Sequence, residues 1–327
     1  MMLAISERTG CPVTFSVTQN EKNPGRWQKT MAEIEAAAAR GLKVSAQIAA
    51  RAVGVMVGFE LTRHPFRSRP SYLEIAKLPI EERVKVLRDP AVKARILAES
   101  PAPDDDFADR LKDYMRVFHL GSPPDYEQPL ENSIGARAKR EGVDPQSIAY
   151  DDMLEDGGKA MLYMPALNYV DGSLDVLRQM MESPQAVPGL SDGGAHCGII
   201  CDASFPTFLL THWARDRERG EKLPLPYVVN LQTKRAAETY GLYDRGVVAP
   251  GYKADLNVID FENLSIEHPE VHHDLPEGGR RLMQRANGYE ATIVSGTITQ
   301  RNGQPTGELP GKMVLGKQAA PTRLAAE

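Results

Sequence analysis

The residues best suited to chemistry lie in one short segment, Gly189-Leu-Ser-Asp-Gly-Gly-Ala-His196. An apolar run ends just before Asp192, so the pattern predicts an acidic side chain at the C-terminal end of a buried strand. Gly193 and Gly194 come next, and glycines let a backbone pass close to a ligand. We therefore take Asp192 as the candidate catalytic residue, with Gly193, Gly194 and His196 as candidates for substrate contact. The same segment also suits a turn in which the Asp192 carboxylate only caps the next stretch of chain.

Three further residues could contact a substrate. Asn168 and Tyr169 lie just after a predicted strand, at the end where α/β enzymes build their sites, although packing of the loop explains them equally well. Arg215 could bind a substrate carboxylate bidentately through its guanidinium. It also belongs to an Arg-Asp-Arg run that is typical of a solvent-exposed surface. The segment His196-Cys197-x3-Cys201 resembles half of a zinc site; without a second ligand pair, two half-buried thiols are the simpler interpretation.

Composition sets broad limits on function. The chain has 327 residues, 42% of them hydrophobic, which is enough for one large or two unequal domains. A formal net charge of -5 and a pI near 5.9 give no electrostatic reason to expect nucleic acid or an acidic membrane surface as a partner. The N-terminus is too weakly apolar for a signal peptide, and no window approaches the ~20 apolar residues of a membrane span. Three sparse cysteines fit a reducing compartment, so we expect a cytoplasmic protein.

Alternating elements must position these residues. A strand over 12–17, a helix over 24–40 and a strand over 42–48 form a βαβ unit, which implies a parallel sheet with a right-handed crossover. The later predicted elements are a strand over 159–163, a helix over 173–181, a strand over 186–190 and helices over 205–219 and 225–240. Asp192 would thus come directly after the last strand of this set.

Two regions depart from this alternation of strands and helices. Between about 59 and 150 the chain reads as charged helices broken by prolines, and so long a departure is typical of an insertion that borders a site. From about residue 242 the pattern is all β, with turns predicted at Ser295-Gly296 and Asn302-Gly303. We place a domain boundary near residue 241 and expect a disordered tail over 317–327.

Together these features resemble the metal-dependent amidohydrolases, and within them the D-aminoacylase branch, the N-acyl-D-amino-acid deacylases. The resemblance rests on Gly189–His196, on Thr233-Lys-Arg-Ala-Ala-Glu-Thr-Tyr-Gly-Leu242 and above all on Asp244-Arg-Gly-Val-Val-Ala-Pro-Gly-Tyr-Lys-Ala-Asp-Leu-Asn-Val-Ile-Asp260. It implies a TIM-type (β/α) barrel with zinc at the C-terminal ends of its strands and a small β-sandwich after it. Asp192 matches the aspartate of the eighth strand, which contacts the metal, takes a proton from the attacking water and passes it to the leaving amine.

The chain also departs from this family pattern. It contains no His-x-His pair, and where histidines are expected after the fifth and sixth strands it has Thr18-Gln19-Asn20 and Gln47. Amides are poor zinc ligands. Moreover, a full barrel takes ~250 residues, whereas only four barrel strands can be counted here, near 13, 44, 160 and 188.

We therefore expect residues 1–241 to form the C-terminal half of an amidohydrolase barrel, and residues 242–316 part of a β-sandwich. The expected function is hydrolysis of a non-peptide C–N bond in a small-molecule amide such as an N-acyl amino acid. The alternative is a catalytically inactive chain that binds a small molecule or a partner. A homo-oligomer or a missing N-terminal half would complete the fold, and the chain alone should hold no catalytic zinc.

Overall fold

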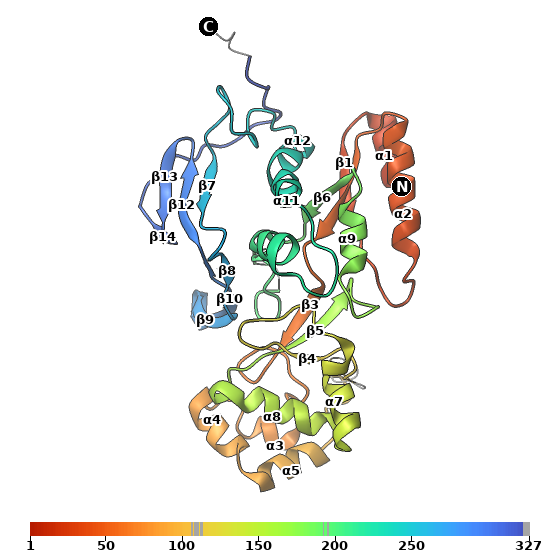
Figure 1. The fold of residues 1–327 in the computed structure, drawn as a ribbon. Helices are drawn as coiled ribbons and strands as arrows, with labels where there is room; N and C mark the ends of the chain where they lie inside the picture. The colour runs from red at the N-terminus through yellow and green to blue at the C-terminus, as the bar shows by residue number, and fades with distance from the viewer. Residues whose placement is uncertain (106, 108–110, 112–113, 192, 195, 323–327) are drawn as a thin grey trace.

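The computed structural model describes residues 1–105, 107, 111, 114–191, 193–194 and 196–322. Its centre is a parallel sheet in the strand order β1 (Val13–Ser16), β2 (Val44–Ala49) and β6 (Ala186–Gly189). Helices α1 (Met2–Thr9), α2 (Arg26–Ala39) and α9 (Asp175–Met181) lie beside this sheet (Figure 1). The predicted βαβ unit is confirmed, because β1, α2 and β2 are consecutive and the two strands run parallel.

The two faces of this sheet differ in polarity. Phe15, Ala46 and Ala186 are partners in the register and share one face, and Ala46 and Ala186 are almost fully buried in the main core with Trp27 of α2. Alternation along the strands sends the neighbouring side chains to the opposite face. That face carries Thr14, Ser16, Ser45 and Gln47, all of them at least partly exposed. One side of the sheet is therefore built for helices and the other for polar contacts.

The strand predicted near residue 160 does not join this sheet. It forms β5 (Leu162–Leu167), which pairs antiparallel with β3 (Val53–Val57) and β4 (Phe118–His119) in a second sheet. The prediction of four neighbouring parallel strands is therefore wrong. The cause is β3, an apolar strand that is separated from β2 by only three residues and pairs with one side of β5.

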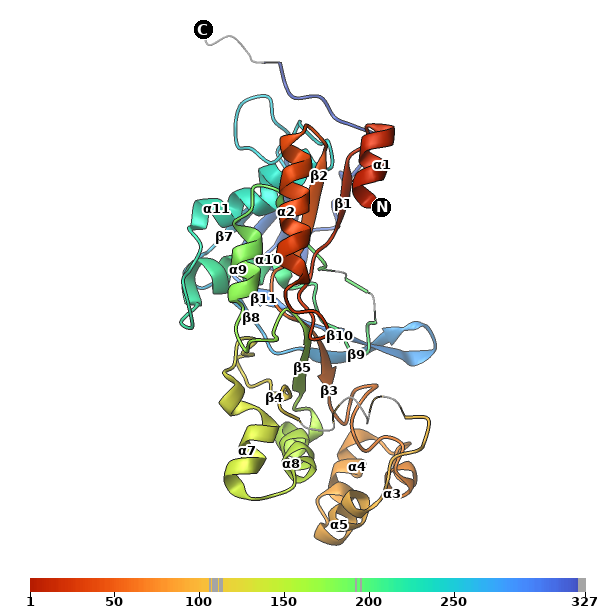
Figure 2. The same ribbon diagram turned by 90° about the vertical axis from the view of Figure 1, so that its right-hand side faces the viewer.

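A helical region lies between β3 and β5, where the insertion was predicted. Its elements are α3 (Pro70–Leu73), α4 (Ile80–Leu87), α5 (Pro90–Ala98), η1 (Leu130–Asn132), α7 (Ile134–Glu141) and α8 (Pro145–Gly158). These helices have a hydrophobic core of their own, which includes Phe59, Phe66 and Tyr150. Both views show them below the parallel sheet, on the far side of β3–β5–β4 (Figures 1 and 2).

A second group of helices comes after β6. These helices are α10 (Phe205–Phe208), the π-helix η2 (Leu209–Asp216), α11 (Leu225–Asn230), the π-helix η3 (Leu231–Arg235) and α12 (Ala236–Thr239). They match the two predicted helices closely. No helix among the described residues is long and apolar enough to cross a membrane.

After residue 241 the regular structure of the described chain is β-strand apart from one 3-10 turn, in agreement with the predicted β pattern. Strands β7 (Leu256–Ile259), β12 (Tyr289–Val294), β13 (Thr297–Arg301) and β14 (Gln304–Pro305) form an antiparallel sheet, with turns at the predicted Ser295-Gly296 and Asn302-Gly303. There are two smaller ladders. In one, β8 (Ser265–Ile266) pairs with β11 (Ala286–Asn287). In the other, β9 (Glu270–Leu275) pairs with β10 (Gly279–Met283), and the 3-10 turn η4 (Pro276–Gly278) connects the two strands. Among the described residues this is one sheet and two ladders, so the sandwich remains a prediction.

Part of the predicted disordered tail is held in place. The backbone N–H of Gln318 donates to Gly241 O at 2.9 Å, and the N–H of Tyr243 donates to Gln318 O at 3.1 Å. These bonds form a parallel bridge between Leu242 and Gln318. The prediction of disorder from residue 317 is therefore wrong at Gln318, whereas residues 323–327 lie outside the described part of the chain.

Candidate functional site

The C-terminal ends of β1, β2 and β6 meet at one edge of the parallel sheet, which is where α/β folds place their active sites. Three segments leave the sheet there, beginning at Val17, Ala50 and Leu190. Asp192, the candidate catalytic and metal-binding residue, belongs to the third segment in sequence but lies outside the described residues. The site is therefore built from its neighbours.

Gln19 and Asn168 form a buried polar pair after β1. The N–H of Gln19 donates to Asn168 Oδ1 at 2.8 Å, and the N–H of Asn168 donates to Gln19 O at 3.0 Å. The Gln19 amide also donates to Asp171 Oδ2 at 2.8 Å. Asn168 is fully buried in a left-handed conformation with φ of 65°, and its Nδ2 has no partner among the described residues. Asn168 thus fixes the loop after β5 to the end of β1.

Arg51 lies just beyond β2 and is fully buried. Its guanidinium carbon is 3.7 Å from the centre of the Tyr126 ring and 4.9 Å from that of Phe205. Nη2 donates to Cys201 O at 2.6 Å, and Nη1 donates to Ser204 Oγ at 3.0 Å. Sequence reasoning missed this residue, and a lone Arg after a strand gives little signal, because Arg is normally exposed.

A small cavity of about 150 Å³ lies at the end of β6. It is lined by Ala50 just beyond β2, by Gly189 and Ser191, and by helix residues that include Phe205 and Gln232. Glycine is required at position 189, because a Cβ there would lie 2.9 Å from Cβ of Gln47 on the neighbouring strand. The amide Nε2 of Gln232 is buried without a hydrogen-bond partner among the described residues. The cavity is thus mostly apolar with one free donor.

The residues that flank Asp192 are placed at the surface. Gly193 and Gly194 are exposed, and Gly194 has φ of 145°, a conformation that only glycine adopts readily. His196 is also exposed, and its carbonyl accepts from the N–H groups of Ile199 and Ile200 at 2.8 and 3.0 Å. His196 therefore begins a turn, and the partial zinc site read from Cys197 and Cys201 is not assembled around it.

Tyr169 and Arg215 have structural partners instead of a cavity. Tyr169 is 2% exposed, and its hydroxyl donates to Gln128 O at 2.6 Å; burial raises its pKa. Arg215 pairs with Asp216 and donates to the carbonyls of Glu262 and Leu264 at 3.0 and 2.7 Å. Arg215 thereby fastens η2 to the segment before β8, away from the sheet end. Their assignment to substrate is not supported by these contacts.

A second residue that sequence reasoning missed is Glu127. Its side chain is 3% exposed and accepts from the Leu174 N–H, from Arg217 and from His212, at distances of 2.8 to 3.0 Å. Burial alone would raise the pKa of Glu127, but these hydrogen bonds lower it to about 2. The network joins the loop before η1 to η2 and α9. His212 of η2 is thus a partner of Glu127.

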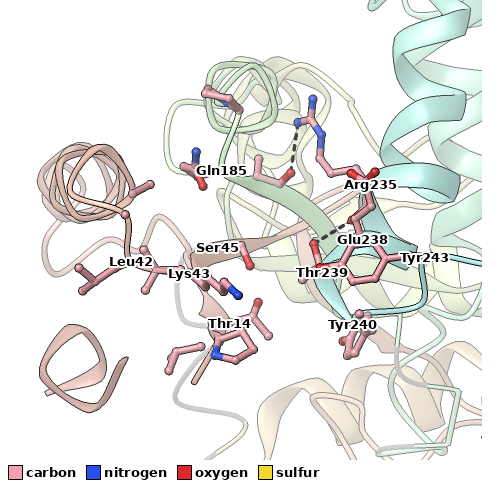
Figure 3. Close-up of a pocket in the computed structure, with 18 of the residues that line it drawn as sticks. Thr14, Leu42, Lys43, Ser45, Gln185, Arg235, Glu238, Thr239, Tyr240 and Tyr243 are labelled. Atoms are coloured by element: carbon pink, nitrogen blue, oxygen red, sulfur yellow. Dashed lines mark hydrogen bonds between the residues drawn. The ribbon is translucent and has the colours of Figure 1, made fainter. Parts of the chain in front are cut away.

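A larger cavity of about 660 Å³ lies at the opposite, N-terminal end of the sheet strands (Figure 3). Thr14 and Ser45 line it from the polar sheet face, and Arg235, Glu238 and Tyr240 line it from the last helices. Arg235 is occupied by the carbonyls of Ser183 and Ala186, both at 3.2 Å. Its position at the N-terminal strand ends sets this cavity apart from the candidate site.

Comparison with known proteins decides the family. A model of the amidohydrolase family matches residues 1–300, which include the parallel sheet, the helical region and most of the β-structure. The chain belongs to the amidohydrolase family. A comparison with curated proteins found no match.

Solved amidohydrolase structures resemble the chain more distantly. A D-aminoacylase crystal structure has 19% identity and a TM-score of 0.46, and covers 94% of this chain. The N-acyl-D-glutamate deacylase from Bordetella bronchiseptica, complexed with zinc and a phosphonate inhibitor, has 18% identity and a TM-score of 0.45, and covers 93%. In both comparisons this amidohydrolase chain spans 50% of the solved chain.

The described residues of this amidohydrolase do not fit a zinc ion. Among them, no three His, Cys, Asp or Glu side chains come together as a metal site. The end of β1 carries Gln19, whose amide is used by Asp171, and the end of β2 carries the guanidinium of Arg51. Burial raises the pKa of Cys201 to about 11, so a zinc ion would have to displace the thiol proton in order to bind there. The zinc implied by the family has no ligand set in the described part of the chain.

Proposed function

We propose that the protein containing this chain hydrolyses a non-peptide C–N bond, the amide of an N-acyl amino acid or a related small molecule. The observation that carries this proposal is the amidohydrolase match over residues 1–300. A second observation supports the proposal. Gly189 packs closely against Gln47 at the end of β6, and Asp192 follows three residues later in the sequence. Close backbone packing at a strand end suits a substrate site.

In the proposed reaction, a water oxygen forms a bond with the acyl carbon and the C–N bond breaks, giving a carboxylic acid and a free amine. Asp192 would take the proton from the attacking water and deliver it to the leaving nitrogen. A carboxylate can do both in turn, because it is regenerated when the amine leaves. Asn168 and Gln19 would contribute by holding the neighbouring loops, since their hydrogen-bonding groups face each other.

The substitution Asp192→Asn tests this role. Loss of general acid–base catalysis costs about 10²- to 10⁴-fold, so kcat should fall by that factor while the fold is kept. Initial rates on N-acetyl-D- and N-acetyl-L-amino acids would be measured for the complete protein. Asp151→Asn is the matched control, because Asp151 is an exposed carboxylate paired with Lys93 in the helical region. Equal turnover in wild type and Asp192→Asn would remove Asp192 from the mechanism.

One observation favours a second function. The absence of a metal ligand set among the described residues suits an amidohydrolase-like chain that binds a small molecule or partner without chemistry. Upstream coding sequence discriminates between the two proposals. A His-x-His after an apolar strand upstream would favour the enzyme, and an upstream sequence without it would favour the binding protein.

A further inference from the structure

Arg51 is a buried cation just beyond the C-terminal end of β2, and the proposed reaction gives it no role. It is 0% exposed, and Tyr126, Phe205 and Phe208 surround its guanidinium with centroid distances of 3.7, 4.9 and 5.6 Å. Asp202 Oδ1 lies 3.7 Å from Nη2, and Asp202 is 6% exposed. A charge removed from water in this way is costly unless partners compensate for it, and here aromatic faces and a carboxylate do so.

The polar partners of Arg51 come from the C-terminal part of one loop. Cys201 O, Asp202 and Ser204 Oγ lie after β6, within the segment that begins at Leu190. Two more contacts hold the same segment from outside. The N–H of Met56 donates to Ile199 O at 2.7 Å, and the N–H of Leu282 donates to Cys197 O at 2.7 Å.

The geometry points to Arg51 as the positioning residue of residues 196–204, the part of the loop after β6 to which its polar partners belong. This inference rests on the proposed function, because it matters for chemistry only if the Asp192 segment is catalytic. Arg51 reaches the segment through a backbone carbonyl, a hydroxyl and a carboxylate together, which a lysine's point charge cannot match. The same charge would disfavour a second cation nearby.

Two neighbours show how the arrangement is locked. Gln284 Nε2 donates to the Tyr126 hydroxyl at 2.8 Å, and Ser204 Oγ donates to Gln284 Oε1. Gln284 therefore links Tyr126, whose ring packs on the guanidinium of Arg51, to Ser204, which accepts a hydrogen bond from Arg51. On the other side, the Trp213 indole donates to Ala50 O at 2.7 Å, which fixes the backbone that precedes Arg51. These contacts fix the groups on both sides of the Arg51 guanidinium and so restrict its position.

The test is hydrogen exchange of the 327-residue chain, with mass spectrometry of its peptides. In Arg51→Lys, exchange in the peptide 196–205 should rise roughly tenfold or more, because charge-assisted bonds to that segment are lost. Exchange in α2 should change little. Arg51→Met with Asp202→Asn is the second variant, since it removes both charges of this buried ion pair together.

Arg217→Met is the matched control, because Arg217 is equally buried but pairs with Glu127 and Asp175. It should raise exchange around α9 and η2 and leave the 196–205 peptide close to wild type. Exchange in 196–205 that is unchanged in both Arg51 variants, or that rises no more than in Arg217→Met, would overturn the inference.

Kinetics of the complete protein supply a readout that loss of stability alone would not give. Arg51→Lys should lower kcat at least roughly tenfold with KM within about twofold of wild type, since it loosens residues 196–204, which follow Asp192 in the sequence, without removing a substrate contact. A rise in KM with kcat unchanged would contradict a positioning role. If wild type hydrolyses no substrate, the proposed function fails, and the exchange result still decides what Arg51 does.

Discussion

At the scale of single residues, Glu127 is the centre of a buried charge network. It is a buried carboxylate that receives hydrogen bonds from an arginine, a histidine and a backbone N–H. Removing one member of a buried, hydrogen-bonded charge set commonly costs about 3–5 kcal/mol, because the remaining charges stay buried and unpaired. We therefore predict that Glu127→Gln lowers the free energy of unfolding at neutral pH by about that amount.

The pH dependence of this loss depends on the pKa of Glu127, which is about 2 in the folded protein and about 4.3 in an unfolded chain. Because the folded value is the lower one, the stabilisation is fully present above the unfolded value and disappears as the pH falls through the folded one. Urea titrations from pH 7 to pH 2 should show the wild-type and Glu127→Gln curves converging at the acid end. Glu33→Gln, on the exposed side of α2, is the control. Parallel curves for Glu127→Gln and wild type would show that Glu127 is not the group responsible.

Residues of this kind are the hardest to find in a sequence. Asn168 was singled out because it lies just after a strand, and it is indeed at the sheet end, but its partner is the Gln19 backbone. Glu127 and Arg51 gave no signal, because the hydrogen-bond partners of their side chains are 47 or more positions away along the chain. Only a folded chain brings such charges together, and charge type without neighbours predicts an exposed side chain.

At the scale of elements, the close approach of β3 and β5 depends on Gly54. A Cβ on this residue would collide with the Tyr163 ring and lie 2.9 Å from Met164 O. The Tyr163 ring is fixed in turn, because its hydroxyl donates to Ala52 O at 2.5 Å. Overpacking of this type costs about 1–3 kcal/mol, so Gly54→Ala should lower the free energy of unfolding by that amount.

Denaturant titration measures the effect of Gly54→Ala, with Gly311→Ala as the matched control. Gly311 has no heavy atom within 4 Å of its would-be Cβ, so its variant should unfold like wild type. If the two alanine variants are equally stable, the second sheet is looser than its contacts indicate.

Element prediction succeeded where local periodicity and tertiary structure agree. The β1–α2–β2 unit, the helix before β6 and the hairpin at Ser295-Gly296 were all predicted, because strand alternation, helix spacing and turn residues are local signals. Strand β3 was missed, although Val53-Gly-Val-Met-Val57 is an apolar, β-branched run of strand length. Missing β3 led to the wrong partner for β5, since sheet order is a long-range property that local patterns do not encode.

At the scale of the whole molecule, the parallel sheet has two edges, β1 and β6, each with one partner strand among the described residues. Its second face carries Thr14, Ser16, Ser45 and Gln47, none of which is fully buried. Unpaired strand edges favour pairing with other chains. We predict that the chain alone associates, which size-exclusion chromatography with light scattering would detect as species larger than 36.0 kDa.

The same organisation predicts the behaviour of the isolated chain toward metal and substrate. Zinc affinity requires several deprotonated ligands that converge in space, and no such set exists among the described residues. The 327-residue chain should therefore contain far less than one zinc per molecule by elemental analysis, and should not hydrolyse a panel of N-acetyl-D- and N-acetyl-L-amino acids with zinc supplied. Asp192→Asn is assayed beside it. Stoichiometric zinc in the wild type, with turnover that Asp192→Asn abolishes, would show instead that this chain carries a complete set of ligands.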